Sequence, residues 1–220
     1  MPESQPMPKF PNPDIPFRLI AIAGDEDRIM AIADIARAHS DICIALMLRD
    51  PGHHPARVEA LARYALGVGL PANVTLIGNH ARPDGVSWLH LTSAQLLDCE
   101  GSPASLPAAP FGVSVHSLDE ALRGAAMGAS YLILSPIFPT SSKPGHPGIG
   151  VDALRRLCAA VRLPLFALGG IDAASAPDAL EAGAYGVAAI SLFAPEKSRE
   201  LDHLFMLLRG IPSRAAGHNQ

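Results

Sequence analysis

Short apolar segments alternate with amphipathic segments along this chain, and eight apolar segments can be distinguished. They carry few polar positions, as is typical of parallel strands buried on both faces. The expected strands are 17–23, 42–48, 74–77, 86–91, 111–115, 131–134, 165–168 and 186–190. The expected helices are 26–39, 55–69, 94–97, 117–127, 151–161, 174–182 and 195–208. This alternation predicts an α/β fold, a small (β/α)8 TIM barrel.

A doubly wound open sheet is the competing arrangement for such a pattern. No G-x-G-x-x-G sequence follows the first expected strand, which weakens that alternative. No segment has the composition of a linker, so we expect one barrel domain over 16–209. The proline-rich residues 1–15 are expected to form a flexible arm and 210–220 a flexible tail. The Ser/Pro/Ala-rich segment 98–110 is expected to be coil.

The composition limits which partners and which cellular compartment we expect for this protein. The chain has 220 residues, a net charge of −4 and no block of basic residues, which argues against nucleic acid or an anionic membrane as a partner. The three cysteines form no C-x-x-C pair and favour a reducing compartment. No signal peptide is evident, and no apolar run reaches the roughly 18 residues of a membrane helix. We therefore expect a cytoplasmic protein that binds a small molecule, with its oligomeric state open.

The segment after the sixth expected strand is the most informative part of the chain. It is a polar, glycine-rich loop that contains Thr140, Ser142 and Lys143. Two further strand ends are Gly169-Gly170 and Ile190-Ser191, and in a barrel all of these meet at the carboxyl-terminal rim. A lysine, hydroxyl groups and backbone amides suit a phosphorylated ligand. The alternatives are a solvated lysine and a tight turn that needs two glycines.

Three more side chains follow strand ends on the same rim. His116 ends the fifth strand and could act as a general acid or base, or else bond to the helix after it. Arg49 could bind a carboxylate or phosphate, and Asn79 a polar ring atom, but either could instead anchor a loop. The remaining histidines match no zinc spacing, so we predict no metal site for them. These histidines are His53, His54, His80, His90 and His146.

Four segments in order resemble the thiamine phosphate synthase/TenI superfamily. They are 113–121, 128–143, 164–171 and 182–191. The resemblance implies a (β/α)8 barrel that acts on a thiazole phosphate in thiamine biosynthesis. It also implies that Thr140, Ser142 and Lys143 hold the diphosphate of a pyrimidine substrate. The thiazole phosphate would be held by backbone amides at Gly169, Gly170, Ile190 and Ser191.

The departures from the superfamily pattern concern magnesium. Synthases usually carry Gln-x-Arg-x-Lys after the second strand, where this chain retains only Arg49. Two aspartates that help to bind magnesium are replaced here by His80 and Gln95. The loss of both carboxylates removes hard oxygen ligands. The comparison therefore favours a TenI-type thiazole tautomerase without a cofactor, in which His116 transfers the proton.

Two alternatives remain open. A divergent synthase would join hydroxymethylpyrimidine diphosphate to the thiazole phosphate and would use Mg2+, and the synthase-like run 139–143 favours it. A non-catalytic protein that binds thiazole phosphate is the third hypothesis.

Overall fold

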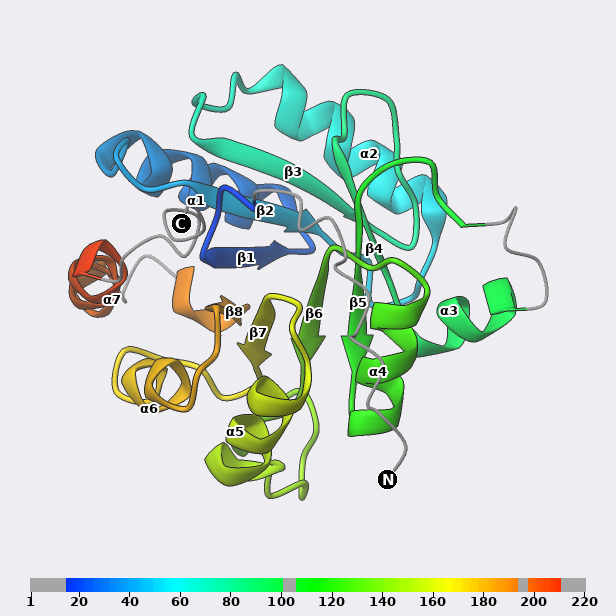
Figure 1. The fold of residues 1–220 in the computed structure, drawn as a ribbon. Coiled ribbons are helices and arrows are strands. Elements are labelled where there is room, and N and C mark those ends of the chain that lie inside the picture. Colours follow the sequence, from blue (N-terminus) through cyan, green and yellow to red (C-terminus); the bar gives the residue numbers. More distant parts are fainter. Residues whose placement is uncertain (1–14, 101–105, 194–197, 211–220) are drawn as a thin grey trace, which may run out of the picture.

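The computed structural model describes residues 15–100, 106–193 and 198–210. Eight parallel strands form a closed barrel in the order of the sequence, and the helices lie outside the ring (Figure 1). The strands are β1 (Leu19–Ala23), β2 (Ile44–Leu48), β3 (Val74–Asn79), β4 (Trp88–Leu91), β5 (Phe111–Val115), β6 (Tyr131–Leu134), β7 (Leu165–Leu168) and β8 (Gly186–Ala189). The prediction of a (β/α)8 barrel is confirmed.

A helix follows most of the strands. The helices are α1 (Glu26–Ala38), α2 (Pro55–Gly67), α3 (Ser93–Glu100), α4 (Leu118–Ala126), α5 (Gly150–Ala160), α6 (Ala176–Glu181) and α7 (Ser198–Gly210), and the short 3-10 helix η2 (Ser191–Phe193) follows β8. The connection between β3 and β4 contains Pro83 and is a loop, as expected from the sequence. None of the helices in the described ranges is long and apolar enough to span a bilayer.

Every helix differs from its expected bounds by at least one residue, and the differences at α3 and α6 have an identifiable cause. Residues 98–100 belong to α3 and are not coil, because Thr92 caps this helix by accepting from the Gln95 amide at 3.2 Å and Leu96 is buried beneath it. Helix α6 is shorter than the expected 174–182 at both ends. Its start is delayed because the Asp172 carboxylate accepts from the amide of Ser175 at 2.8 Å and holds the preceding residues in a turn.

The strands are apolar on both faces because each face packs against a different part of the core. In β1, Leu19, Ala21 and Ala23 join the large cluster between the strands and the helices. Ile20 and Ile22 belong to a second cluster inside the barrel. Successive side chains of a strand point to opposite faces, so one uninterrupted apolar segment supplies both clusters.

Aromatic side chains fill the barrel interior at the amino ends of the strands. The ring of Phe17 lies 5.6 Å from that of Trp88, 6.0 Å from that of Tyr131 and 5.8 Å from that of Phe166, measured between centroids. Tyr131 needs a glycine beside it, because a Cβ added at Gly112 would lie 2.1 Å from the Tyr131 ring. This aromatic plug closes one end of the barrel and leaves the carboxyl end available for a ligand.

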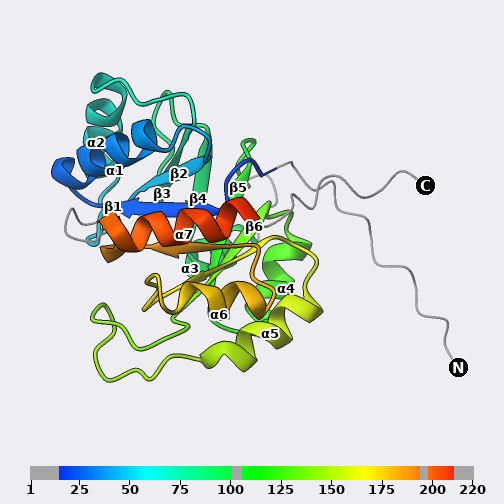
Figure 2. The same cartoon turned by 90° about the vertical axis from the view of Figure 1, so that its left-hand side faces the viewer.

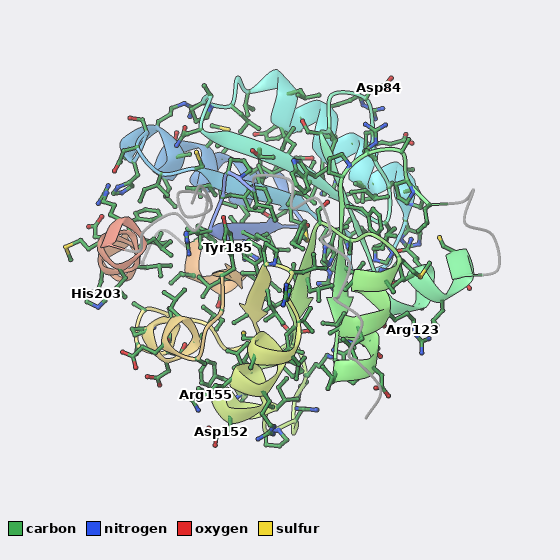
Figure 3. The ribbon with its side chains drawn as sticks, viewed as in Figure 1. Asp84, Arg123, Asp152, Arg155, Tyr185 and His203 are labelled. Carbon is green, nitrogen blue, oxygen red and sulfur yellow. The ribbon has the colours of Figure 1, made fainter. Side chains whose placement is uncertain are left out.

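The expected arm and tail are mostly outside the described residues, which exclude 1–14 and 211–220. Ile15, which we assigned to the arm, is only 8% exposed and packs with the interior cluster. Its carbonyl accepts from the Tyr185 hydroxyl at 2.9 Å, close to the amino end of β8. Figure 3 labels Tyr185 beside β1 and β8.

Candidate functional site

A cavity of about 500 Å³ opens at the carboxyl ends of the strands, a volume suited to a small organic ligand. It is lined by every site residue proposed from the sequence, namely Arg49, Asn79, His116, Thr140, Ser142, Lys143, Gly169, Gly170, Ile190 and Ser191. The long loop between β6 and α5 extends on this side of the barrel (Figure 2). The structure therefore brings together residues from six different strand ends, while their roles remain a proposal.

The β6–α5 loop is anchored to the neighbouring strand and presents a compact turn. The amides of Ile137 and Phe138 donate to β7 and to the residue after it, at 2.9 and 3.0 Å. Further along, the Lys143 amide donates to the carbonyl of Thr140 at 3.2 Å. The Lys143 ammonium forms no ion pair with any residue in the described ranges. Its positive charge is therefore available to a ligand in the cavity.

Gly169 and Gly170 have positive φ angles of 97° and 65°, a conformation that favours glycine. A Cβ at Gly170 would lie 2.5 Å from the carbonyl oxygen of Pro139. The glycine pair therefore also serves the close packing of the β6 and β7 loops. The Asp172 carboxylate accepts from the amides of Ala174 and Ser175, at 3.0 and 2.8 Å, so these two amides are engaged within the turn that precedes α6.

Asn79 is 4% exposed and lies at the end of β3. Its Nδ2 donates to the carbonyl of His90 at 3.3 Å. Its Oδ1 is buried without a hydrogen-bond partner among the described residues. Burying a hydrogen-bond acceptor without a donor costs free energy. We therefore expect a ligand or a water molecule to donate a hydrogen bond to this oxygen.

His53 and His80 meet at the edge of the cavity next to Arg49. Nδ1 of His53 and Nε2 of His80 are 2.5 Å apart. Burial lowers the pKa of His80, and the neighbouring His53 and Arg49 lower it further. A hydrogen bond with Gln95 and the carboxylate of Asp50 act in the opposite direction and are outweighed, and Asp50 also accepts from the ring and the amide of His54.

A second polar group crosses the floor of the cavity. His90 in β4 is 1% exposed, with Nδ1 3.1 Å from the Tyr131 hydroxyl and Nε2 2.8 Å from Oγ of Ser114. Burial lowers the pKa of His90 to about 3, so its ring is neutral near neutral pH. Burial also raises the pKa of Tyr131. This chain of neutral groups fixes the orientation of the Ser114 hydroxyl, which lines the cavity.

His116 follows β5 and has a defined tautomer. Its Nδ1 lies 2.6 Å from the carbonyl oxygen of Ser135, so Nδ1 carries the hydrogen. Nε2 is then the basic nitrogen of the ring. The main chain is held in place too, because the His116 amide donates to the Glu120 carboxylate at 2.7 Å. The ring is thus oriented for proton transfer at the cavity wall.

Comparison with known proteins supplies the family. Residues 24–193 match the TMP-TENI family, described as thiamine monophosphate synthase. The chain belongs to this family. A putative thiamine-phosphate synthase of Geobacter sulfurreducens is 33% identical over 182 residues, which cover 77% of this chain and 80% of that protein. The resemblance noted in the sequence is therefore confirmed.

Two further proteins are similar to this chain, one over a shorter segment of sequence and one in fold alone. A thiamine-phosphate synthase of Methanoculleus marisnigri is 46% identical over 108 residues, 49% of this chain and 51% of its own length. The chain thus spans about half of that relative. The solved thiamine phosphate pyrophosphorylase of Pyrococcus furiosus superposes with a TM-score of 0.68 at 20% identity, covering 88% of this chain and 96% of its own. At that identity the likeness concerns the fold.

Magnesium does not fit the residues that this member of the thiamine monophosphate synthase family presents. Magnesium prefers oxygen ligands, above all carboxylates. Asp172 is the one carboxylate among the described residues that line the cavity. At the two positions noted above stand His80, which contacts His53, and Gln95, whose side-chain oxygen accepts from the Thr92 amide at 3.0 Å. Within the described ranges, no group of three or more histidine, cysteine or acidic residues is arranged so that it could hold a metal ion.

Sequence reasoning missed His90, Ser114 and the contact between His53 and His80 in this family member. The histidines had been weighed only as metal ligands. For His90 and Ser114 a signal exists, because each is a polar residue inside an otherwise apolar strand. A polar side chain at such a position points either into the barrel or against a helix. The pattern alone does not say which of the two faces it occupies.

Proposed function

We propose that this chain is a thiamine phosphate synthase that joins hydroxymethylpyrimidine diphosphate to a thiazole phosphate. The observation that carries the proposal is that one cavity holds two separate sets of groups suited to anions. One set is the hydroxyls and the lysine of residues 140–143, and the other is the backbone at 169–170 and 190–191. Two such sets suit a reaction between two phosphorylated substrates better than an isomerisation of one.

The names of the relatives support the same choice. The sequence analysis favoured a tautomerase because magnesium ligands are missing. The matched curated relatives named above carry the name thiamine-phosphate synthase, in one case as putative. These names support the synthase over the reaction first favoured. A transferase in this family is therefore the better proposal.

In the proposed reaction the thiazole nitrogen attacks the methylene carbon of the pyrimidine substrate. A carbon–nitrogen bond forms, the bond from that carbon to the diphosphate oxygen breaks, and the diphosphate leaves with the bonding electron pair. Lys143 and the hydroxyls of Thr140 and Ser142 would stabilise the charge that the leaving oxygen gains. Asn79 Oδ1 would accept from an amino group on the pyrimidine, since this buried oxygen lacks a partner.

Side chains of this protein would supply much of the positive charge for the diphosphate. The described lining residues offer Arg49, Lys143 and histidines, with Asp172 as the one carboxylate. We therefore expect catalysis to depend on these side chains and to respond less to added magnesium than a site built from carboxylates would.

A thiazole tautomerase is the second candidate, favoured by the geometry of His116. With Nδ1 bonded to the carbonyl of Ser135, Nε2 is ready to accept a proton from a ligand in the cavity. A tautomerase would need the thiazole site alone. Under this alternative, residues 140–143 would have no diphosphate to bind.

Mass spectrometry of the purified protein incubated with the pyrimidine diphosphate and the thiazole phosphate, with and without magnesium, tests the proposal. Formation of thiamine phosphate at enzymatic rates supports the synthase. Absence of product together with deuterium exchange into a carboxylated thiazole phosphate supports the tautomerase. Binding of the thiazole phosphate without either reaction would identify a non-catalytic binding protein and overturn both enzymes.

The Lys143→Ala variant makes this test specific for the diphosphate site. Loss of a charged hydrogen-bond donor costs about 1.5–3 kcal/mol, so KM for the pyrimidine diphosphate should rise by roughly 10- to 150-fold. Thiazole phosphate binding should stay within a few-fold. Arg155→Ala is the matched control, since Arg155 pairs with Asp152 on the outside of α5 (Figure 3). Equal effects of the two substitutions would remove Lys143 from the site.

A further inference from the structure

We propose that His53 and His80 form a histidine pair that binds an anionic group together with Arg49 and takes up one proton as the anion binds. The pair lies at the ends of the neighbouring strands β2 and β3. In a closed barrel of eight strands this wall is opposite β6 and β7, where Lys143 and the glycine pair lie. It is therefore a third set of possible hydrogen-bond donors to an anion, which faces the other two sets across the same cavity.

The backbone holds the two rings toward each other. His53 and His80 have φ angles of 60° and 67°, and both belong to the left-handed region that residues other than glycine seldom adopt. Such conformations are energetically unfavourable and cluster at functional sites. Both rings line the cavity, and their nitrogens are 2.5 Å apart. The loops after β2 and β3 therefore both adopt an unfavourable backbone conformation at the residue that makes this contact. Such an arrangement indicates a binding site.

The contact limits the number of protons that the pair can hold. One of the two facing nitrogens must donate and the other must accept, so only one hydrogen fits between them. The neutral pair has one further hydrogen on an outer nitrogen. A single added proton occupies the other outer nitrogen and makes both outer nitrogens donors. A second added proton would place hydrogens on both facing nitrogens and break the contact. The pair therefore switches between neutral and singly charged.

The surroundings favour the neutral form of His80 and make an anion the trigger for its protonation. Burial lowers the pKa of His80, and the positive charge of Arg49 acts in the same direction. The other groups nearby are Gln95 of α3, which hydrogen bonds to His80, buried His90 of β4, and Asp50, which is bonded to His54. An anion beside the outer nitrogens would favour the charged form and raise the pKa. Proton uptake should therefore accompany anion binding.

This inference rests on the proposed function only for the identity of the anion, a phosphate or the diphosphate of the pyrimidine substrate. In a synthase the added proton would offset the negative charge that the diphosphate gains as its bond to carbon breaks. The binding step itself needs no turnover. If the protein shows no synthase activity, anion binding by the histidine pair can therefore still be tested on its own.

Nitrogen-15 NMR of the histidine rings, titrated with pH in the absence and presence of sulfate, tests the pair. Sulfate does not titrate near neutral pH, so any proton taken up belongs to the protein. The variants His53→Gln and His80→Gln assign the two signals. We expect the two rings to take up one proton together, at an apparent pKa that sulfate raises by about one unit or more. Repeating the titration with inorganic pyrophosphate covers a ligand of diphosphate size.

The affinity for sulfate supplies a second readout. In the unmodified protein it should rise by up to about tenfold per pH unit as the pH falls between the free and bound pKa values. His80→Gln should lose most of this pH dependence. The control is His203→Gln, because His203 lies on the outside of α7 and far from the cavity (Figure 3). This variant should retain the pH dependence of the affinity for sulfate.

Three results would overturn the proposal. The first is rings that take up two protons independently. The second is rings whose signals respond to neither sulfate nor pyrophosphate at saturation. The third is a stoichiometric response of both rings to Zn2+ with no effect of the anions on their titration, which would make the pair a metal site instead.

Discussion

Buried His90 should make the protein sensitive to mild acid. In the folded protein the ring is enclosed, and burial lowers the pKa of His90 from 6.5 to about 3. In the unfolded chain the same ring titrates near its ordinary pKa of about 6.5. Between these two values the unfolded state binds a proton that the folded state does not. The free energy of unfolding therefore falls as the pH falls through this window.

The size of the effect follows from the shift. Each pH unit within the window is worth about 1.4 kcal/mol, so His90 alone should remove about 2 kcal/mol of stability between about pH 7.5 and about pH 5. A typical domain is stable by only about 5–15 kcal/mol, so the loss is measurable. Above about pH 7.5 both states hold a nearly neutral ring, and His90 should contribute almost no pH dependence.

Urea unfolding followed by circular dichroism at several pH values measures this slope. In His90→Gln the side chain can still hydrogen bond to Tyr131 or Ser114 but does not titrate. This variant should be less stable at about pH 7.5 and should lose about 2 kcal/mol less than the parent on going to about pH 5. His203→Gln, an exposed substitution, controls for the removal of a histidine. An unchanged slope in His90→Gln would refute the assignment of acid sensitivity to this ring.

Two further predictions concern packing and proton transfer. Gly112→Ala should destabilise the protein by about 1–3 kcal/mol in urea unfolding, because its Cβ would lie 2.1 Å from the Tyr131 ring. Gly67→Ala, in α2 with nothing within 4 Å of the added Cβ, should be neutral or stabilising, and equal effects would contradict the packing argument. Under the tautomerase alternative, His116→Ala should lower deuterium exchange into the thiazole phosphate by about 100-fold or more, with binding of that ligand by calorimetry within a few-fold. Unchanged exchange would exclude His116 from proton transfer.

Much of the architecture could be predicted from local pattern. Apolar segments separated by amphipathic helices indicate strands that are buried on both faces, and their order indicates a barrel. The rim position of Arg49, Asn79, His116 and Lys143 also follows, since the carboxyl ends of parallel strands meet at one end of a barrel. Local patterns suffice here because burial and strand direction depend on neighbouring residues.

The packing inside the barrel and the contacts across the cavity were decided by the tertiary structure. His53 and His80 are 27 positions apart in the sequence, and His90 and Tyr131 are 41 apart. Whether such side chains meet depends on the register of adjacent strands, on which face each residue takes, and on the backbone angles of the loops. These are set by closure of the whole barrel, because one shift in register would turn every inward side chain outward. The sequence by itself therefore determined the fold and the rim, and only the closed barrel decided which polar groups share a proton.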